Sequence, residues 1–269
     1  MSEADILLRQ DHDGVTVLTL NRPERMNALS GSLARAIEQA LADCLAPSSA
    51  TRVIVLTGSG RGFCAGADLS EKLDVPDGSS VLETWYHPLV RSLYNYPIPI
   101  VAAVNGVAAG AGMSLALMSD IILCSESATF LQAFVKVGLV PDCGATWLLP
   151  RRIGEARARE MSLMAEKLPA ARAFEWGLVN RVCPDADLIR ESLALAATLA
   201  NGPINALSRT SALYNASPTN DFEAQIQMEA RMQSQCSGGS ESLEGRSAFL
   251  EKRKPDFSNI GLATPDQTL

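Results

Sequence analysis

Apolar residues recur along the chain with two periods, one typical of strands and one typical of helices. In "GVTVLTLNRP" they alternate with polar or opposite-facing positions, which predicts a half-buried strand that ends at Pro23. The runs "RVIVLTG", "IPIVAAVN" and "DIILCS" are continuous, short and rich in β-branched residues, which predicts buried strands. Helical spacing begins at Ser30 and near Ser80, and "GAGMSLALM" is predicted to form a further helix. Apolar residues at that spacing are Leu33, Ile37, Leu41 and Leu45 in the first helix and Leu82, Trp85, Leu89 and Leu93 in the second.

The two halves of the chain differ in pattern. Up to about residue 130, strands and helices alternate, which favours an α/β layered fold with a largely parallel sheet. Beyond Gly144 the spacing is mostly helical, with one strand predicted at "LVNRVC" and a helix stop at Gly177. We therefore predict an α/β core over residues 1–199 and a helical C-terminal region over residues 200–269.

Composition narrows the class of protein. The 269 residues are 47% hydrophobic and carry a formal charge of −7, so a nucleic-acid partner is not expected. No apolar run approaches the roughly 20 residues that span a bilayer, and the first residues do not resemble a targeting leader. The six cysteines form no CxxC pair and are interpreted as reduced core thiols. We expect a cytoplasmic protein with no membrane partner.

Several kinds of chemistry are poorly supplied. The only histidines are His12, expected in an exposed turn, and His87, expected to pack or to line a pocket. A metal cluster or a Ser-His-Asp triad is therefore disfavoured, and no metal site is predicted. The segment "GSGRG" lacks the GxGxxG spacing of a dinucleotide loop.

Two glycine-rich turns and one isolated acid remain as candidate sites. The turns "FCAGADL" and "AAGAGMSL" each leave a buried strand and are predicted to enter a helix, whose first N–H groups lack partners. Side by side, such turns would form an oxyanion hole; alternatively, glycine only relieves crowding there. Asp142, in the apolar stretch "AFVKVGLVPDCGATWLLPR", is either a turn residue or a catalytic base.

Three segments, "NRPERMNALS", "TGSGRGFCAGADLSE" and "VAAVNGVAAGAGMSLALMSDIILCSESATF", resemble the enoyl-CoA hydratase/isomerase (crotonase) superfamily in order and spacing. The resemblance covers roughly residues 5 to 255. It implies a ClpP-like spiral of ββα units and a helical C-terminal region used in trimerisation, giving a homotrimer or a dimer of trimers. It also implies an acyl-CoA thioester substrate and no cofactor beyond the coenzyme A that the substrate carries.

The resemblance assigns roles to positions of this sequence. The two amides that hold the thioester oxygen fall on Ala67 and Ala111, and the adenosine-binding backbone falls near Ala65. A cation near Lys254, often supplied by a neighbouring subunit, would meet the CoA phosphates. The other positions expected along the substrate path are Glu24, Arg25, Met26, Gly66, Asp68, Leu69, Gly110, Ser114 and Phe134. From the residues alone, Asp68 is also expected to cap a helix, and Asp120 to be structural.

The departures from the family pattern concern the catalytic acids. Hydratases carry two glutamates that activate water, and their positions match Ser114 and Phe134 here, so hydration by two carboxylates is poorly supported. "AAGAGMSLAL", "WYHPLVRSL" and the stretch around Asp142 resemble instead the isomerase subgroup that acts on ring-1,2-epoxyphenylacetyl-CoA. That subgroup is also credited with shifting enoyl-CoA double bonds.

The resemblance implies an enzyme in which Asp142 serves as the acid/base. The carboxylate would take a proton from C2 of a 3-enoyl-CoA and return it at C4, or assist the opening of an epoxide and its expansion to an oxepin. A hydratase with relocated water activation and a catalytically silent acyl-CoA-binding subunit remain as alternatives. Apolar neighbours are expected to desolvate Asp142 and raise its pKa, namely Phe134, Val137, Leu139 and Trp147.

Overall fold

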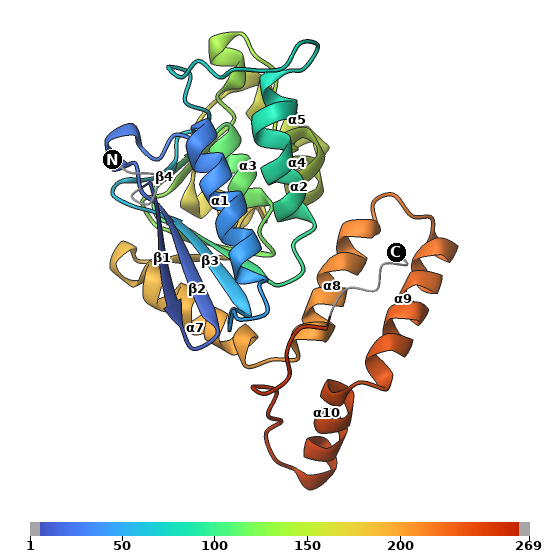
Figure 1. Cartoon of the computed structure of the whole chain (residues 1–269). Helices are drawn as coiled ribbons and strands as arrows, with labels where there is room; N and C mark the ends of the chain where they lie inside the picture. The colour runs from blue at the N-terminus through green and yellow to red at the C-terminus, as the bar shows by residue number, and fades with distance from the viewer. Residues whose placement is uncertain (1–5, 264–269) are drawn as a thin grey trace.

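The strands of the protein form two sheets that the chain visits in alternation. The computed structural model describes residues 6–263 (Figure 1). The first sheet runs in the order β1 (Leu7–His12), β2 (Val15–Leu20), β3 (Val53–Gly58), β5 (Ile100–Val104), β7 (Ile121–Ser125) and β10 (Arg181–Cys183). The second sheet runs in the order β4 (Gly62–Cys64), β6 (Val107–Ala109), β8 (Thr129–Leu131) and β9 (Leu168–Pro169).

Three consecutive strand pairs give the fold its spiral. The pairs β3–β4, β5–β6 and β7–β8 each place a long strand in the first sheet and a short one in the second. Because successive pairs are neighbours in both sheets, each pair stacks on the one before it like a turn of a spiral. From β2 to β10 all neighbours in the first sheet are parallel, so the predicted parallel α/β sheet is confirmed.

The first sheet is buried on both faces, which explains its continuous apolar runs. On one face lie α1 (Gly31–Cys44) and α2 (His87–Tyr94), packed against residues such as Leu18 and Ile54 (Figure 1). On the other face lies α7 (Leu188–Ala200), which packs against Val17 and Val55. Alternate residues of one strand therefore belong to two separate apolar clusters.

Most predicted helices are confirmed, with their start and stop signals. The Oγ of Ser30 accepts a hydrogen bond from the Leu33 N–H at 3.1 Å, and Gly177, with φ of 78°, follows α6 (Ala170–Glu175). Ser80 and Glu83 exchange hydrogen bonds as a capping box ahead of a π-helical turn (Leu82–Tyr86) that leads into α2. The remaining core helices are α3 (Ala111–Leu117), α4 (Ala145–Ile153), α5 (Glu155–Met164) and α6 (Ala170–Glu175).

Two sequence expectations are wrong. No helix follows the first glycine-rich turn: residues 69–80 run as loop and turns, so Asp68 caps no helix. His12 was expected in a turn, but it is the last residue of β1, a strand that the sequence pattern did not predict. β1 pairs antiparallel with β2 through a turn at Asp13 and Gly14. Its residues are mostly exposed, which is why its hydrophobic pattern is weak.

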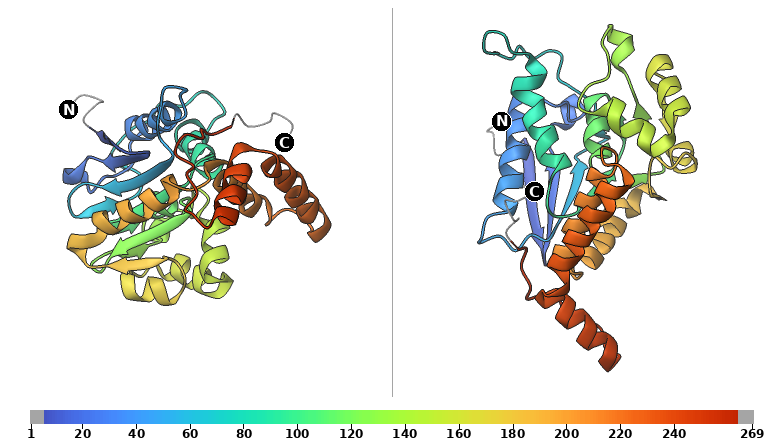
Figure 2. Two further views of the ribbon diagram at one scale, coloured as in Figure 1. Left: turned by 90° about the horizontal axis from the view of Figure 1, so that it is seen from below. Right: turned by 90° about the vertical axis from the view of Figure 1, so that its right-hand side faces the viewer.

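The C-terminal helices form an arm beside the layered core. The arm contains α8 (Ile204–Ala216), α9 (Phe222–Ser237) and α10 (Ser240–Glu251), and it projects away from the sheets (Figures 1 and 2). Arg52 of the core binds both ends of the arm. Its guanidinium donates hydrogen bonds to the carbonyls of Ala200, Gly202 and Ile260 at 2.5, 2.9 and 2.5 Å. The boundary predicted at residue 200 falls between α7, on the sheet, and α8, in the arm.

None of the helices within residues 6–263 is both long and apolar enough to span a membrane.

Candidate active site

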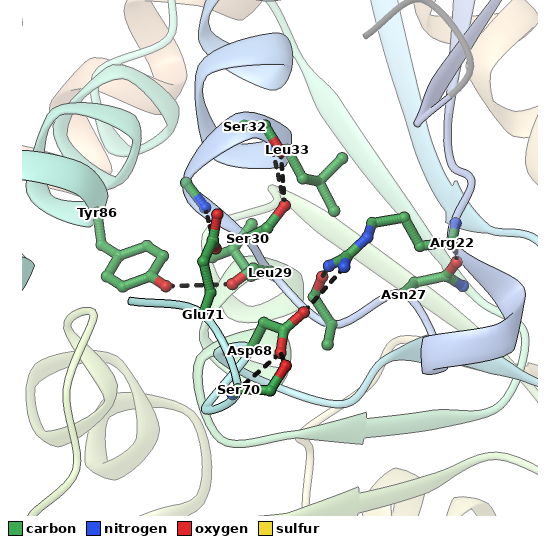
Figure 3. Close-up of polar contacts among 12 residues, drawn as sticks. Arg22, Asn27, Leu29, Ser30, Ser32, Leu33, Asp68, Ser70, Glu71 and Tyr86 are labelled. Carbon is green, nitrogen blue, oxygen red and sulfur yellow. Dashed lines mark hydrogen bonds and ion pairs between the residues drawn. The ribbon is translucent and has the colours of Figure 1, made fainter. Parts of the chain in front are cut away.

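The first glycine-rich turn is held by a short pairing with the chain before α1. The Leu29 N–H donates to the Gly66 carbonyl at 2.7 Å, and the Asp68 N–H donates to the Leu29 carbonyl at 2.9 Å. The Ala67 N–H between these two bonds is directed away from Leu29, and within residues 6–263 it makes no backbone hydrogen bond. Tyr86 adds a hydrogen bond from its hydroxyl to the Leu29 carbonyl at 3.1 Å (Figure 3). The turn thus presents a free backbone donor at Ala67.

An ion pair between Arg22 and Asp68 connects the same turn to the segment before α1. Arg22 donates to the Ala28 carbonyl at 2.6 Å and to the Asp68 carboxylate at 2.8 Å (Figure 3). The other Asp68 oxygen accepts hydrogen bonds from the Ser70 hydroxyl and N–H. The Ser70 hydrogen bonds and the Arg22 charge lower the pKa of the Asp68 carboxyl. Asp68 is therefore a fully engaged anchor of the turn.

The second glycine-rich turn begins α3. Gly110, with φ of 50° and ψ of −127°, is its N-cap, and Ala111 is its first residue. The first N–H groups of a helix have no partner within the helix, so the Ala111 N–H is available to a ligand. Gly112 lies so close to the Cys64 carbonyl that a Cβ there would overlap it, which packs the start of α3 tightly against β4.

The two glycine-rich turns lie side by side. Gly66, at φ of 100°, is so near the second turn that an added Cβ would lie 3.0 Å from the Ala109 carbonyl oxygen and 3.6 Å from the Ala111 nitrogen. Backbone donors at Ala67 and Ala111 can therefore approach one ligand oxygen together. Paired backbone N–H groups of this kind stabilise an oxygen that gains negative charge.

Phe134 forms a wall beside the second turn. It begins a 3-10 turn (Phe134–Val137), is only 7% exposed, and its ring tip would lie 3.5 Å from a Cβ built on Gly110. An aromatic ring here keeps water from that side of the turn. Ser114 is fully buried, so solvent does not reach its side chain.

Asp142 lies in a tight turn against α3. Its carbonyl accepts hydrogen bonds from the Ala145 N–H at 3.0 Å and from the Ser114 hydroxyl at 3.3 Å, and Cys143 and Gly144 follow at φ of 50° and 77°. The Oδ1 of Asp142 is buried, and no hydrogen-bond partner for it lies within residues 6–263. Burial without a hydrogen-bond partner disfavours the ionised form of a carboxyl.

Desolvation raises the pKa of the Asp142 carboxyl, in the predicted direction, and a hydrogen bond from the Cys143 thiol and the charge of His87 oppose it. Of the apolar neighbours expected to cause this, Phe134 is buried. Val137 and Leu139, in contrast, are 56% and 51% exposed. Trp147 is also partly exposed, with the Arg151 guanidinium 3.5 Å from its ring centre. Val137, Leu139 and Trp147 are thus not buried, in contrast to the expected apolar surroundings of Asp142.

The segment expected along the CoA path adjoins the first turn. The Ala65 N–H donates to the Met26 carbonyl at 3.0 Å. Met26 directly follows a 3-10 turn (Pro23–Arg25), on which Glu24 and Arg25 are exposed. Leu69, on the other side of the turn, is 70% exposed. Lys254 is exposed and follows α10, the helix that Figure 1 shows at the end of the arm, away from α3.

Sequence reasoning did not identify several residues that shape the site. Arg22 lies within the motif "NRPERMNALS" and could have been considered as a partner for Asp68. Leu29 and Tyr86 act through the backbone of the turn, and no local pattern marks them. Asp120 was expected to be structural, and it accepts hydrogen bonds from the Ile100 N–H and the Ser211 hydroxyl, which confirms that expectation.

Comparison with known proteins agrees with this geometry. The sequence profile of the enoyl-CoA hydratase/isomerase family matches residues 10–260, and the chain belongs to this family. The chain is 44% identical to a probable enoyl-CoA hydratase of Rhodobacter capsulatus, over 91% of this chain and 95% of that protein. It is 42% identical to the 1,2-epoxyphenylacetyl-CoA isomerase of Escherichia coli, over 94% and 98%.

Solved structures share the fold. The crystal structure of an enoyl-CoA hydratase from a Polaromonas species superposes with a TM-score of 0.86 at 33% identity, covering 93% of this chain and 98% of that one. The crotonase fold expected from the sequence is thus confirmed.

Proposed function

We propose that the protein is an acyl-CoA isomerase in which Asp142 moves a proton beside an oxyanion hole formed by the Ala67 and Ala111 amides. The observation that carries this proposal is the buried, unpartnered Oδ1 of Asp142. Its turn is bonded to α3, the helix that begins with Ala111. The 42% identity to a 1,2-epoxyphenylacetyl-CoA isomerase supports the same choice.

The chemistry follows from the acidity of a thioester. The two amides would stabilise the negative oxygen of a dienolate formed when a proton leaves C2 of a 3-enoyl-CoA. Asp142 would accept that proton and return it at C4, so that the double bond moves into conjugation and no atom is gained or lost. With a 1,2-epoxyphenylacetyl-CoA, the protonated acid would assist the ring opening that leads to the oxepin.

Hydration is the second candidate, because relatives of this chain carry the name enoyl-CoA hydratase. The residues of the site weigh against it. The two positions that match the hydratase glutamates hold Ser114, which is fully buried, and Phe134, which has no acid group. Asp142 would then have to activate water alone, beside an aromatic wall.

The CoA moiety would pass Met26 and Ala65, and a neighbouring subunit would supply the cation at Lys254. We further propose a homotrimer or a dimer of trimers. Large apolar side chains on the arm support this assembly, since they are exposed in the single chain. They include Tyr214, Phe222, Phe249 and Leu250, at 76–82% exposure.

The experiment follows the absorbance of the conjugated enoyl thioester with two substrates. A rise with trans-3-enoyl-CoA is expected, and Asp142→Asn should abolish it while a saturated acyl-CoA still binds. Asp43→Asn, at an exposed position on α1, is the matched control and should keep full activity. If Asp142→Asn turned over at the wild-type rate, the proposal would be wrong.

The second substrate separates the alternatives. A fall in absorbance with trans-2-enoyl-CoA would favour hydration. No change with either substrate, with acyl-CoA binding intact, would leave the epoxide as the test of isomerisation. If turnover of 1,2-epoxyphenylacetyl-CoA were also absent, the chain would be a catalytically silent acyl-CoA-binding subunit.

A further inference from the structure

Ser114 lies between the two parts of the proposed site. It is one turn along α3 from Ala111 and is fully buried. Its Oγ lies 3.4 Å from the Gly110 carbonyl oxygen and 3.3 Å from the Asp142 carbonyl oxygen. A serine hydroxyl has one hydrogen to donate, so it serves one of these carbonyls at a time.

The two carbonyls differ in how much they need the hydroxyl. The Gly110 carbonyl already accepts the Ser114 N–H at 3.1 Å, inside the first turn of α3. The Asp142 carbonyl accepts the Ala145 N–H at 3.0 Å, but Ala145 is the first residue of α4, so this bond does not connect the turn to α3. Within residues 6–263, no other hydrogen bond joins the 141–144 turn to α3. The Ser114 hydroxyl is therefore the polar link between the turn that carries the acid and the helix that carries an oxyanion donor.

The backbone of this turn makes that link important. Cys143 and Gly144 both have positive φ, and the turn belongs to neither sheet. A segment with few backbone partners moves more easily than a strand in a ladder. A carboxylate that takes a proton from one carbon and returns it to another must keep its distance from the oxyanion hole.

We infer that Ser114 is a positioning residue, which fixes the distance between the Asp142 carboxylate and the oxyanion donors of Ala67 and Ala111. The inference rests on the proposed isomerase function. It differs from the expectation that Ser114 lies along the substrate path, because the side chain is fully buried and its hydroxyl contacts backbone carbonyls. The hydroxyl contacts the backbone of Asp142 and not its carboxylate. Its loss should therefore affect the rate of the chemical step and leave substrate binding unchanged.

The test compares two deletions of a buried hydroxyl. Ser114→Ala removes the link. Ser192→Ala, on α7, removes an equally buried hydroxyl that has no hydrogen-bond partner in the part of the chain that the structure describes. For isomerisation of trans-3-enoyl-CoA, Ser114→Ala should lower kcat between about 10-fold and 100-fold, because small misplacements of catalytic groups have costs of this size. Its KM and its dissociation constant for a saturated acyl-CoA should stay within about 2-fold of wild type. Ser192→Ala should leave all three values unchanged.

A further substitution separates positioning from packing. Ser114→Cys keeps a side chain of similar volume with a weaker donor, so its kcat should lie between those of wild type and Ser114→Ala. It also serves as the test if Ser114→Ala fails to fold. Equal kcat for Ser114→Ala and Ser192→Ala, or a fall in binding that matches the fall in kcat, would overturn the inference.

Failure of the inference can be told from failure of the proposed function. If wild type isomerises 3-enoyl-CoA, Asp142→Asn is inactive and Ser114→Ala is fully active, only the positioning role is wrong. If Asp142→Asn is as active as wild type, the proposed function and the inference both fail. A double substitution provides a check: in the Asp142→Asn background, Ser114→Ala should not lower the residual rate of C2 deuterium exchange further.

Discussion

Arg22 and Asp68 form an ion pair at 2.8 Å that connects the segment before α1 to the first glycine-rich turn. Their side chains are only 15% and 9% exposed, so the pair is largely shielded from solvent. Arg22 also bonds the Ala28 carbonyl. The geometry of the Ala67 amide thus depends on a charge pair that lies behind it.

We expect Arg22→Met to destabilise the protein by about 3 kcal/mol, because it leaves the Asp68 carboxylate poorly solvated and without its counter-ion. The measurement is urea unfolding at pH 7. Asp68→Asn combined with Arg22→Met should recover part of the loss, since the neutral amide needs no counter-ion. A double variant that is less stable than Arg22→Met would contradict this account.

Gly66→Ala should lower both the stability of the protein and its binding of acyl-CoA more than a typical substitution of a surface glycine does. The residue has φ of 100°, and a Cβ there would lie 3.0 Å from the Ala109 oxygen. We expect a loss of about 1–3 kcal/mol from backbone strain, together with weaker binding of acyl-CoA, because the two turns would be forced apart. Gly78→Ala is the control, since it also has positive φ but no atom within 4 Å of its Cβ position. Equal acyl-CoA binding by the two variants would contradict the adjacency of the turns.

Burial raises the pKa of the Asp142 carboxyl, so the folded state disfavours its ionised form. Above the raised pKa, this penalty counts against folding; below the ordinary value of about 3.9, the carboxyl is protonated in both states and the penalty vanishes. Asp142→Asn should therefore have a higher Tm than wild type at pH 7, and the difference should narrow as the pH falls toward 4. A series of thermal scans checks this, with Asp43→Asn as the control. A difference that widens on acidification would contradict the direction of the pKa shift.

The arm offers a test of assembly. Phe249 and Leu250 on α10 are 82% and 79% exposed in the single chain. If they are covered in a trimer, Phe249→Ser with Leu250→Ser should lower the mass measured by light scattering toward that of a monomer. The control is Leu163→Ser, which removes a 70% exposed side chain from α5, a helix outside the arm. Unchanged mass in the double variant would show that this face is not the interface.

The parts of the fold that the sequence predicts well are those with a strong period. The long strands of the first sheet are buried on both faces, and α1 begins with the N-cap residue Ser30, whose hydroxyl accepts the Leu33 N–H. The short strands β4, β6 and β8 have three residues each, too few for an alternation to appear. The edge strand β1 has no apolar alternation that would predict it, because its side chains mostly face solvent.

For the site, the residues pointed to Asp142 and to both glycine-rich turns as candidates, and the resemblance assigned roles to them, but neither showed how the turns are held. The first turn was expected to expose its amide as a helix start. Instead, the pairing of Leu29 with Gly66 and Asp68 leaves the Ala67 amide free. Contacts such as that of Tyr86 with the Leu29 carbonyl join residues 57 positions apart, and periodicity cannot reveal them.

The C-terminal arm leaves the core at Gly202 and returns at Ile260, and a single guanidinium, that of Arg52, binds both points. Between these points α8 is bonded to the core as well: Ser211 donates to Asp120, and Asn215 and Tyr94 exchange hydrogen bonds between their side chains and backbone carbonyls. Within residues 6–263, the side-chain hydrogen bonds between the arm and the core involve α8 and the two ends of the arm, and none comes from α9 or α10. Substitutions on α9 and α10 can therefore leave the strands of the core undisturbed, provided that α8 and Arg52 keep these contacts.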